Sequence, residues 1–506
     1  MKTNSPMLFD ENLWKEWSRK VEVDFDAKKY THFDFKFNFP SKKNQLYDLL
    51  KDPTNVARHS FLPFIKIKIK TPRYRYQENE REYGLETKIR PISFAAHLDT
   101  YLYSFYSYIL NKKYQEYIHQ IGVAESVLAY RNDLGGRCNI QFAKEVFDFI
   151  KSKGRCCALT LDIKGYFDSI DHILLKEKWC KVVGEKKLPE DEYAIYRSLT
   201  KYAYVNKTTF LKHFRVNLKS ADKKQPNLLG YIPGESFEEK FQLLRDHNVI
   251  TNNKTNELIG VRKRFFGIPQ GSAISAVLSN VYLLDYDTYL CRLAKERGIL
   301  YRRYCDDILI VCDTDQAMEI QMLAIDKIRE YHLTIQDRKV EAIQFSSNSR
   351  GQIRAFNQKK IVSSENEAQD AGKESQYYKN LQYLGFEFNG KDVLIRSSSL
   401  SRYFRKMKAK IDKTIKMAYS DKGIGDRVFK QKLFHRYTHL GRRNFLRYAY
   451  NASQSVYMNA KRERKEGFDS PAIRKQLIRH FIILEKTLEK QNASRAKLKG
   501  KALKKI

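Results

Sequence analysis

The chain has 506 residues, enough for about three domain-sized units with a large buried core. Its 94 Lys and Arg residues outnumber its 59 Asp and Glu residues, so the formal net charge is +35. This excess exceeds what solubility requires and predicts a polyanionic partner. Nucleic acid is favoured because 13% of the residues are aromatic and can stack on bases, although a generically basic surface is the alternative.

The composition also excludes several classes of protein. The seven cysteines include no C-x-x-C pair and are too few for a disulfide scaffold, so we expect a reducing, cytoplasmic location. No stretch approaches about 18 consecutive apolar residues, and acidic residues stand near the start, where a signal peptide needs an apolar core. The sequence therefore predicts no membrane partner.

The first part of the chain alternates between strand and helix patterns. Isoleucine alternates with lysine over residues 65–70, which predicts a strand with one aliphatic face and one cationic face. Apolar residues at helical spacing predict a helix after Leu98 and another over residues 139–151. The second helix leads into residues 155–163, an apolar strand pattern with Asp162 at its end.

The later part begins with a polar insertion over about residues 173–264, where helical pieces alternate with loops. We then expect one long helix between Gly271 and Gly298, with the second glycine at its end. Residues 300–311 form two apolar runs around a polar centre and predict a hairpin. From Ser397 onward the pattern is helical and strongly basic.

Three segments carry the chemistry, and their order matters more than any one of them. They are LTLDIKGYFDSIDH from Leu159, FFGIPQGSAISAVLSN from Phe265 and YRRYCDDILIV from Tyr301. Nucleotide addition needs attack of a 3′ hydroxyl on an α-phosphate, and two divalent ions about 3.5–4 Å apart can stabilise the attacking and leaving oxygens. Because Mg²⁺ keeps water and phosphate among its oxygen ligands, two or three Asp residues are sufficient.

Asp162, Asp306 and Asp307 can provide these carboxylates. An isolated Asp-Asp pair at a hairpin tip usually serves only the geometry of the turn. Here apolar strands flank the pair, so burial would confine two like charges that raise each other's pKa until a cation neutralises them. We therefore predict that the three aspartates converge on a metal site.

In this order the segments resemble motifs A, B and C of bacterial reverse transcriptases, and the likeness extends over about residues 87–389. The resemblance implies an α+β right-hand polymerase with fingers, a palm with an antiparallel sheet and a helical thumb, followed by a basic all-helical extension. It implies an N-terminal segment and fingers at 1–154, a palm at 155–395 that includes the insertion, and thumb and extension at 396–506.

The resemblance also assigns roles to residues of the metal site. Asp162, Asp306 and Asp307 would be catalytic residues and metal ligands, and the backbone carbonyl of Ile163 would be a further ligand. The implied cofactor is a pair of Mg²⁺ ions, for which Mn²⁺ can substitute. Asp168 lies where a helix is expected to begin, so we predict that it caps the helix.

A nucleotide-binding set is implied in the same way and contains Lys88, Arg90, Arg131, Phe167, Gln270, Gly271 and Lys339. Phe167 matches a ring that leaves no room for a 2′ hydroxyl and so favours deoxynucleotides, with core packing as the alternative. Lys88, Arg90 and Arg131 match cations that hold the triphosphate, with ordinary surface charge as the alternative. Lys339 matches the motif D lysine that protonates pyrophosphate, and LQYLGFEF from Leu381 resembles motif E, a support for the primer.

The insertion, the AYR segment ending at Arg131 and the basic helical end resemble the abortive-infection, defence-associated branch of the family. That branch implies an antiphage role with a cognate noncoding RNA, and in some members synthesis that is protein-primed or untemplated. The implied partners are an RNA template or that noncoding RNA, the DNA product and dNTPs, with a homo-oligomer as an open alternative.

Other classes of protein stay open. A group II intron-type maturase shares the polymerase core but adds a region for RNA splicing. An RNA-dependent RNA polymerase is less expected because Phe167 should exclude ribonucleotides. An RNA-binding scaffold with a relic polymerase fold would also be basic, but the intact set of three aspartates argues for catalysis.

Overall fold

The computed structural model describes residues 9–24, 30–77, 82–217, 227–259, 262–358, 377–420, 428–441 and 444–503. Helices and antiparallel strands are mixed along the chain, so the predicted α+β class is confirmed. Within these ranges, no helix combines the length and apolar character needed to cross a membrane.

A five-stranded antiparallel sheet contains the strands that are predicted to carry the carboxylates. In spatial order its strands are β11 (Ile353–Asn357), β10 (Glu341–Ser347), β3 (Cys156–Asp162), β9 (Asp307–Cys312) and β8 (Leu300–Tyr304). Strands β3 and β9 are neighbours and are mostly buried on both faces, which explains their nearly continuous apolar sequences. The predicted strand ending at Asp162 and the predicted hairpin over residues 300–311 are both confirmed.

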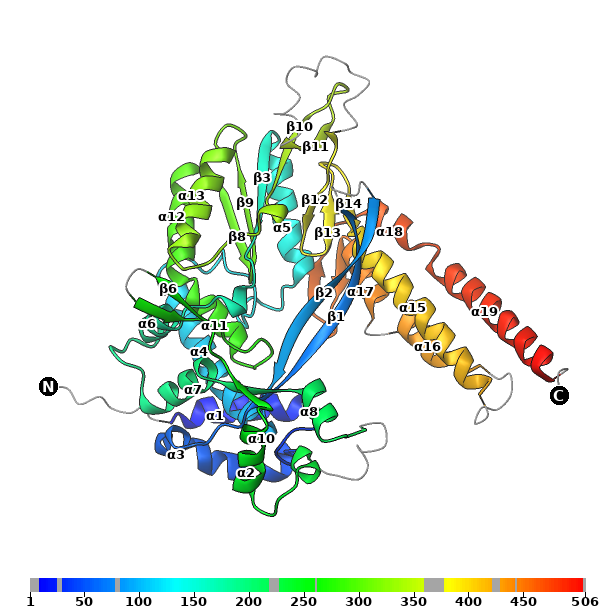
Figure 1. Ribbon diagram of the computed structural model, residues 1–506. Coiled ribbons are helices and arrows are strands. Elements are labelled where there is room, and N and C mark those ends of the chain that lie inside the picture. Colours follow the sequence, from blue (N-terminus) through cyan, green and yellow to red (C-terminus); the bar gives the residue numbers. More distant parts are fainter. Residues whose placement is uncertain are drawn as a thin grey trace.

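The sheet separates two hydrophobic cores because alternate residues of a strand point to opposite faces. Cys156 and Ala158 of β3 belong to the core that contains α5 (Asn139–Lys153) and the C-terminal helices. Cys157 and Leu159 belong to the other core, which contains the helices between β3 and β9 and after β9. The sheet is therefore held from both sides, as Figure 1 shows for α5 on one side and α12 and α13 on the other.

The helix expected between Gly271 and Gly298 is two helices. Helix α11 (Ser275–Tyr282) and helix α12 (Leu284–Arg297) are separated at Leu283, whose ψ of 14° departs from the helical value. Residues 281–284, on both sides of this break, are fully buried. Because the break depends on packing against other segments, the helical periodicity of the sequence alone could not indicate it. Gly298 ends α12 in the left-handed conformation, as predicted.

A second sheet carries a long two-stranded arm. Its order is β2 (Glu82–Phe94), β1 (Phe64–Gln77), β4 (Ala203–Asn206) and β5 (Ile250–Asn252). Strand β4 pairs with β1 only over residues 64–66, so most of the β1–β2 ribbon has no third strand among the residues that the structure describes. Figure 1 shows the ribbon extending away from α8 as an arm. The strand predicted at residues 65–70 is confirmed.

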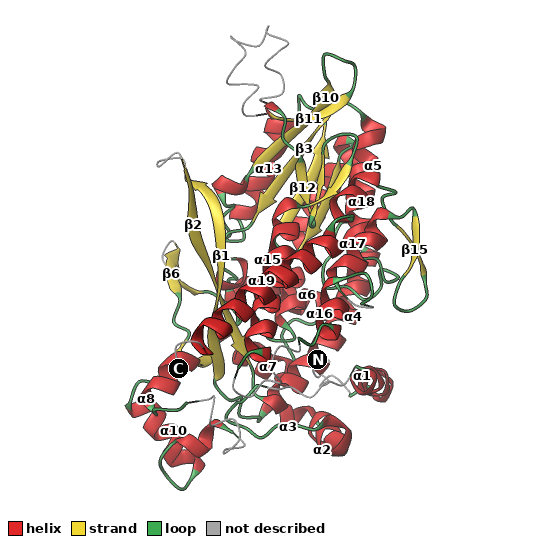
Figure 2. Ribbon diagram, turned by 90° about the vertical axis from the view of Figure 1, so that its right-hand side faces the viewer, coloured by secondary structure: helices red, strands yellow, loops and turns green. Residues whose placement is uncertain are grey.

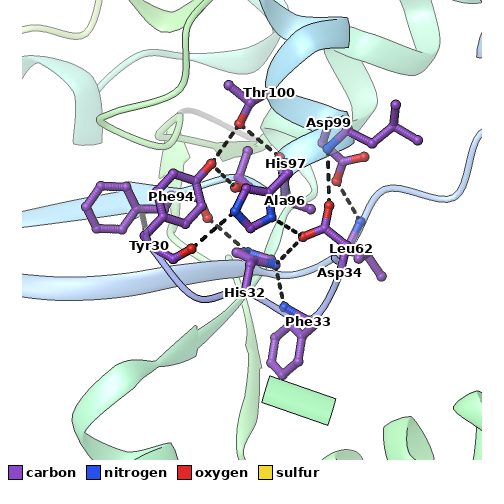
Figure 3. A network of polar contacts seen from close by, with 12 residues as sticks. Tyr30, His32, Phe33, Asp34, Leu62, Phe94, Ala96, His97, Asp99 and Thr100 are labelled. Carbon is purple, nitrogen blue, oxygen red and sulfur yellow. Dashed lines mark hydrogen bonds and ion pairs between the residues drawn. The ribbon is translucent and has the colours of Figure 1, made fainter. Parts of the chain in front are cut away.

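The first helices of the chain are α1 (Glu11–Val23), α2 (Phe39–Leu50), α3 (Pro53–Ala57) and α4 (His97–Gln120). A buried polar network fastens residues 30–34 to the start of α4 (Figure 3). The Asp34 carboxylate accepts a hydrogen bond from the His97 ring at 2.7 Å, and the Tyr30 hydroxyl donates to the Ala95 carbonyl at 2.9 Å. Because Ala95 directly follows β2, this network anchors the base of the ribbon.

The insertion contains more regular structure than its sequence indicated. Its helices are α6 (His172–Val183), α7 (Glu190–Thr200), α8 (Lys207–His213) and α10 (Phe237–Asp246), with a short 3₁₀-helix η2 (Leu228–Tyr231). Besides β4 and β5 it contains the hairpin β6 (Asn256–Ile259) and β7 (Arg262–Phe265). Each of these strands has only three or four residues, so the period-two pattern was too brief to reveal them.

The C-terminal part is mainly helical, as predicted. It follows the small sheet β12 (Leu381–Tyr383), β13 (Phe386–Phe388) and β14 (Val393–Ile395), and contains α15 (Ser397–Ala418), α16 (Gln431–Tyr437), α17 (Phe445–Ser453), α18 (Pro471–Leu477) and α19 (His480–Leu503). Helices α15 and α19 contact each other and lie side by side in Figure 2. The expectation of an all-helical extension is wrong in one place, where β15 (Val456–Met458) and β16 (Arg464–Glu466) form a hairpin.

Candidate active site

The three predicted carboxylates lie at the same end of neighbouring strands. Asp162 is the last residue of β3, and its Cα partner across the ladder is Asp307, the first residue of β9. Asp306 lies in the turn between β8 and β9, where its carbonyl accepts a hydrogen bond from the Ile163 N–H at 3.2 Å. The backbones of residues 162, 306 and 307 therefore lie together at one end of the sheet, while their binding of a metal stays a prediction.

Lys339 is brought to Asp162 by an extension of β3. The Lys164 N–H donates to the Thr334 carbonyl at 2.8 Å, and the Gln336 N–H donates to the Asp162 carbonyl at 2.9 Å. These bonds place the following 3₁₀-helix η3 (Asp337–Lys339) beside the end of β3. Lys339 Nζ then donates to Asp162 Oδ1 at 2.5 Å, so the cation predicted at the site contacts a predicted carboxylate.

Burial and mutual repulsion disfavour the ionised forms of Asp306 and Asp307. Burial, followed by the charges of Asp306 and Asp162, raises the pKa of Asp307 to about 6, while Lys339 opposes the shift. The pKa of Asp306 is also raised, first by burial and then by the charge of Asp162. A cation bound between these groups would stabilise their ionised forms.

The donor set fits a hard divalent cation that brings other ligands with it. In the described ranges, no three Asp, Glu, His or Cys side chains are arranged so that they alone could hold a metal ion. The Asp162 carboxylate is directed instead at Lys339. Because Mg²⁺ usually keeps water and substrate phosphate among its ligands, carboxylates from β3 and the β8–β9 turn can be sufficient once a nucleotide is bound.

Phe167 lies in the turn that follows β3. Gly165 has φ 57°, which lets the chain turn sharply into the 3₁₀-helix η1 (Tyr166–Asp168). Phe167 is partly buried against the larger core, and its carbonyl accepts a hydrogen bond from the Ile268 N–H at 2.9 Å. This backbone hydrogen bond joins the first motif segment to the second at Phe167.

The predicted cap at Asp168 is wrong. Asp171 is the N-cap of α6, and its Oδ1 accepts hydrogen bonds from the Ile173 N–H at 2.7 Å and the Leu174 N–H at 3.0 Å. Arg264 also contacts the Asp171 carboxylate at 3.1 Å. Asp168 and Asp171 both precede an apolar sequence with helical spacing. Asp168 is the last residue of the 3₁₀-helix η1, and α6 begins only after Asp171.

Gln270 and Gly271 contact the base of the ribbon. The Gln270 carbonyl accepts a hydrogen bond from the Ser93 N–H at 2.8 Å. Gly271 has φ 118°, and a Cβ at this position would lie 2.8 Å from the Ser93 carbonyl oxygen. The glycine therefore permits close approach of two backbones, and Lys88 and Arg90, partly buried further along β2, extend from this junction.

Comparison with protein families matches residues 235–388 to the family described as reverse transcriptase (RNA-dependent DNA polymerase). A reverse transcriptase domain is present. The matched range includes Gln270, Asp306 and Asp307 and begins after Asp162, so it covers the second and third motif segments. The prediction of a reverse transcriptase is confirmed at the level of the domain, while the defence-associated branch stays a prediction. No curated protein matches the chain.

Solved structures similar to the chain include three structures of telomerase from two Candida species. The apo telomerase from Candida tropicalis truncated from its C-terminal domain has a TM-score of 0.39 and 11% identity, covering 70% of this chain and 60% of that one. Telomerase from Candida albicans with a fragment of telomeric RNA has a TM-score of 0.34 and 12% identity, covering 74% and 54%. The apo telomerase from Candida tropicalis has a TM-score of 0.36 and 11% identity, covering 94% and 68%. The chain thus spans less than two thirds of the first two structures, and similarity at this level does not establish a shared activity.

Arg131 does not present its guanidinium to the carboxylates of the reverse transcriptase domain. Its side chain is only 1% exposed, and its Nε donates to Asp133 Oδ1 at 2.9 Å while its Nη2 pairs with the same carboxylate. Its Nη1 donates to the backbone carbonyls of Ala124 and Val127. The predicted contact with a triphosphate is therefore not favoured by the structure, because the guanidinium is already used to fix residues 124–133.

A buried ion pair behind the β8–β9 turn was not predicted from the sequence. Arg303 and Asp287 have 0% and 1% exposed side chains, and two hydrogen bonds of 2.7 and 2.6 Å join them. Arg303 Nη1 also donates to the Cys305 carbonyl at 3.0 Å, and the Asn280 side chain lies at 3.3 Å. Arg303 thus holds the backbone directly before Asp306.

The burial of Arg303 could have been predicted from the sequence around it. In β8 and the turn, Tyr301, Arg303 and Cys305 alternate with the more exposed Arg302 and Tyr304. A period of two therefore places Arg303 on the apolar face, where a charged residue needs a buried partner. That partner, Asp287, comes from α12 and could not be identified without the fold.

Proposed function

We propose that this chain is an RNA-directed DNA polymerase whose catalytic, metal-binding residues are Asp162, Asp306 and Asp307. The observation that carries the proposal is the pairing of Asp162 with Asp307 at the ends of adjacent strands, with Asp306 in the intervening turn. The reverse transcriptase domain at residues 235–388 supports it. In this arrangement the carboxylates lie on a rigid sheet that is packed on both faces.

The proposed cofactor is a pair of Mg²⁺ ions, which Mn²⁺ can replace. Divalent ions held there would neutralise the carboxylates and stabilise charge on the oxygens of the attacked phosphate. The backbone carbonyl of Ile163 is a proposed further ligand. The Ile163 N–H donates to the Asp306 carbonyl, and this bond holds residue 163 beside residue 306. Lys339, which holds Asp162 in the structure, is positioned to donate a proton near the leaving phosphate once a nucleotide is bound.

The proposed nucleotide site uses residues from both neighbouring segments. Phe167 would restrict the sugar, and Gln270 would face the nucleotide beside it, because Phe167 and Ile268 bond the two segments together. Lys88 and Arg90 extend from the same junction on β2 and would neutralise phosphates. Gly271 contributes through its close contact with Ser93, and Arg131 is not part of the proposed site.

The architecture of a right-hand polymerase follows from this proposal. Residues 1–154, which contain the β1–β2 ribbon, would form the N-terminal segment and fingers, residues 155–395 the palm, and residues 396–506 the thumb and extension. The five-stranded sheet would be the palm, with β12 to β14 supporting the primer beside it. A cognate noncoding RNA and a role in antiphage defence are part of the same proposal and rest on the resemblance of the insertion and basic helical end.

The test is polymerisation by the double variant Asp306→Asn, Asp307→Asn. Purified protein with an RNA template, a DNA primer, labelled dNTPs and Mg²⁺ should incorporate nucleotides, and the variant should lose incorporation while keeping its affinity for RNA. Asp326→Asn removes an exposed carboxylate and serves as the control for lost charge. Undiminished synthesis by the double variant would contradict the assignment.

The same preparation tests the proposed RNA partner. RNA that copurifies with the protein is sequenced together with any DNA product, and protection of cells from phage is compared between the wild type and the double variant. Bound RNA without synthesis in the wild type would favour a scaffold over a polymerase. Protection that survives loss of Asp306 and Asp307 would contradict a defence role based on DNA synthesis.

A further inference from the structure

Tyr130 is a bulky residue in a backbone conformation that it rarely adopts. Its φ is 61°, in the left-handed region, where bulky residues are strained and glycine and asparagine are favoured. The residue is 42% exposed, although the neighbouring Ala129 is buried and the Arg131 side chain is only 1% exposed. Such conformations persist where the surroundings enforce them, and they concentrate at functional sites.

The surroundings fix Tyr130 from both sides. The Leu128 N–H donates to the Arg303 carbonyl at 2.9 Å, and the Arg303 N–H donates to the Ser126 carbonyl at 2.8 Å. The Asn280 side chain donates to the Ala129 carbonyl at 2.8 Å. On the other side Arg131 is held by its ion pair with Asp133. The position of Tyr130 is therefore set by β8 and α11, the elements that carry the second and third motif segments.

Tyr130 lies near the turn that contains Asp306. The loop before it is bonded to Arg303, three residues before Asp306. Burial raises the pKa of Tyr130, and the neighbouring Cys305 and the charge of Asp306 raise it in the same direction. Cys305 itself is only 4% exposed, whereas Tyr130 is 42% exposed.

Helix α11 links Tyr130 to the proposed nucleotide site. Asn280 of α11, whose side chain donates to the Ala129 carbonyl, directly follows Ser279. The Tyr166 hydroxyl donates to the Ser279 carbonyl, and the rings of Tyr166 and Phe167 have centroids 5.8 Å apart. Residues 129 and 166 therefore meet the same turn of α11, beside Phe167, where the incoming nucleotide is proposed to bind.

We propose that the exposed part of the Tyr130 ring is a contact surface for the sugar or base of the incoming deoxynucleotide. This inference rests on the proposed polymerase function and adds a residue to its substrate site. An aromatic face suits this task for all four nucleotides, because every base has a π-face that can stack on a ring. The AYR segment then contributes a ring to the site, and its arginine fixes the loop that presents the ring.

Steady-state kinetics of Tyr130→Asn and Tyr130→Phe test the inference. Asparagine tolerates the left-handed conformation but removes the ring, so the KM for each dNTP should rise about 5- to 150-fold, the effect expected for loss of one stacking contact, with a smaller change in kcat. Phenylalanine keeps the ring and loses only the hydroxyl, so the KM should stay within about twofold of the wild type. The matched control is Tyr193→Asn on α7, since Tyr193 is 41% exposed and lies outside the motif segments.

The outcomes separate this inference from the proposed function. A purely structural role predicts that Tyr130→Asn, which relieves backbone strain, leaves the dNTP KM unchanged in an active enzyme, and that result would overturn the inference. A rise in the dissociation constant of the primer–template without a rise in the dNTP KM would also overturn it. An inactive wild-type protein would instead contradict the polymerase function. Thermal unfolding of each variant shows whether the protein is folded.

Discussion

At the scale of single residues, the Arg303–Asp287 pair shows how the fold fixes the turn before Asp306. The pair is fully buried, and Tyr301 donates a further hydrogen bond to Asp287 at 2.6 Å. Desolvation makes such a pair costly to form, so it adds little net stability over apolar packing, but removal of one partner leaves a buried charge without compensation. Its value lies in the geometry that it imposes on the Cys305 carbonyl.

Asp287→Asn should therefore lower both stability and activity. Loss of one partner of a buried pair costs about 3–5 kcal/mol, which urea unfolding can measure. Incorporation should fall further than the folded fraction does, because Arg303 would no longer hold the turn in place. Asp326→Asn breaks an exposed pair with Arg329 and should change the stability by less than about 1 kcal/mol. Equal effects of the two substitutions would contradict this role.

A second residue-scale feature is the buried Glu192 at the start of α7. Burial raises its pKa to about 7, although its Oε2 accepts a hydrogen bond from Trp179 at 2.7 Å. In the folded state Glu192 keeps its proton to a higher pH than in the unfolded state. Between the ordinary pKa of 4.5 and about 7, the unfolded state binds fewer protons than the folded state, so stability falls as pH rises and then levels off.

Glu192→Gln should remove this part of the pH dependence. Glutamine keeps an oxygen for Trp179 and cannot ionise. The variant should therefore lack the loss of about 1–3 kcal/mol in unfolding free energy that Glu192 contributes between pH 5 and pH 8 in the wild type. The comparison must be between the two proteins, because other groups act oppositely. His32, for example, has a pKa lowered by burial to about 4 and favours folding as pH rises to its ordinary value. Identical pH dependence in both proteins would contradict the prediction.

At the scale of elements, Gly271 joins the second motif segment to β2. A Cβ there would lie 2.8 Å from the Ser93 carbonyl and 3.0 Å from a methyl group of Ile92, and φ is 118°. Gly271→Ala should destabilise the protein by more than about 1 kcal/mol and reduce incorporation, because the contact that positions Gln270 must open. Gly351→Ala is the matched control, with φ 70° and no atom within 4 Å of its Cβ. A similar loss in both variants would show that backbone strain alone is responsible.

Local patterns were sufficient to predict the elements that carry the carboxylates. Alternation and apolar runs gave β3 and the β8–β9 hairpin, and helical spacing gave α5, because each pattern lies within a few neighbouring residues. The break at Leu283 and the hairpin β15–β16 depend on packing against distant segments, so the periodicity missed them. The site residues divide in the same way. Asp162, Asp306 and Asp307 were identified from short local motifs, while the ion pair of Arg131 with Asp133 and the strained backbone of Tyr130 are visible only in the fold.

At the scale of the whole molecule, the β1–β2 ribbon is a long element that lies apart from the five-stranded sheet, as Figures 1 and 2 show. Among the described residues, no third strand pairs with the ribbon outside its junction with β4, and a two-stranded ribbon is only marginally stable by itself. Lys68 and Lys70 are exposed on one face of β1. A polyanion bound to this face would explain both the cations and the projecting ribbon.

RNA binding should therefore be strongly salt-dependent, and the ribbon should account for part of the dependence. Each phosphate neutralised by a protein cation releases counterions, so Lys68→Gln with Lys70→Gln should make the slope of log K against log[salt] shallower by about 1.4 to 2. Lys186→Gln with Lys187→Gln removes the same charge from two exposed lysines between α6 and α7 and should leave the slope unchanged. Equal changes in the two double variants would mean that the net charge of +35 acts without a preferred surface. A different change for the ribbon alone identifies β1 as a contact for the phosphate backbone, because counterion release counts contacts and not total charge.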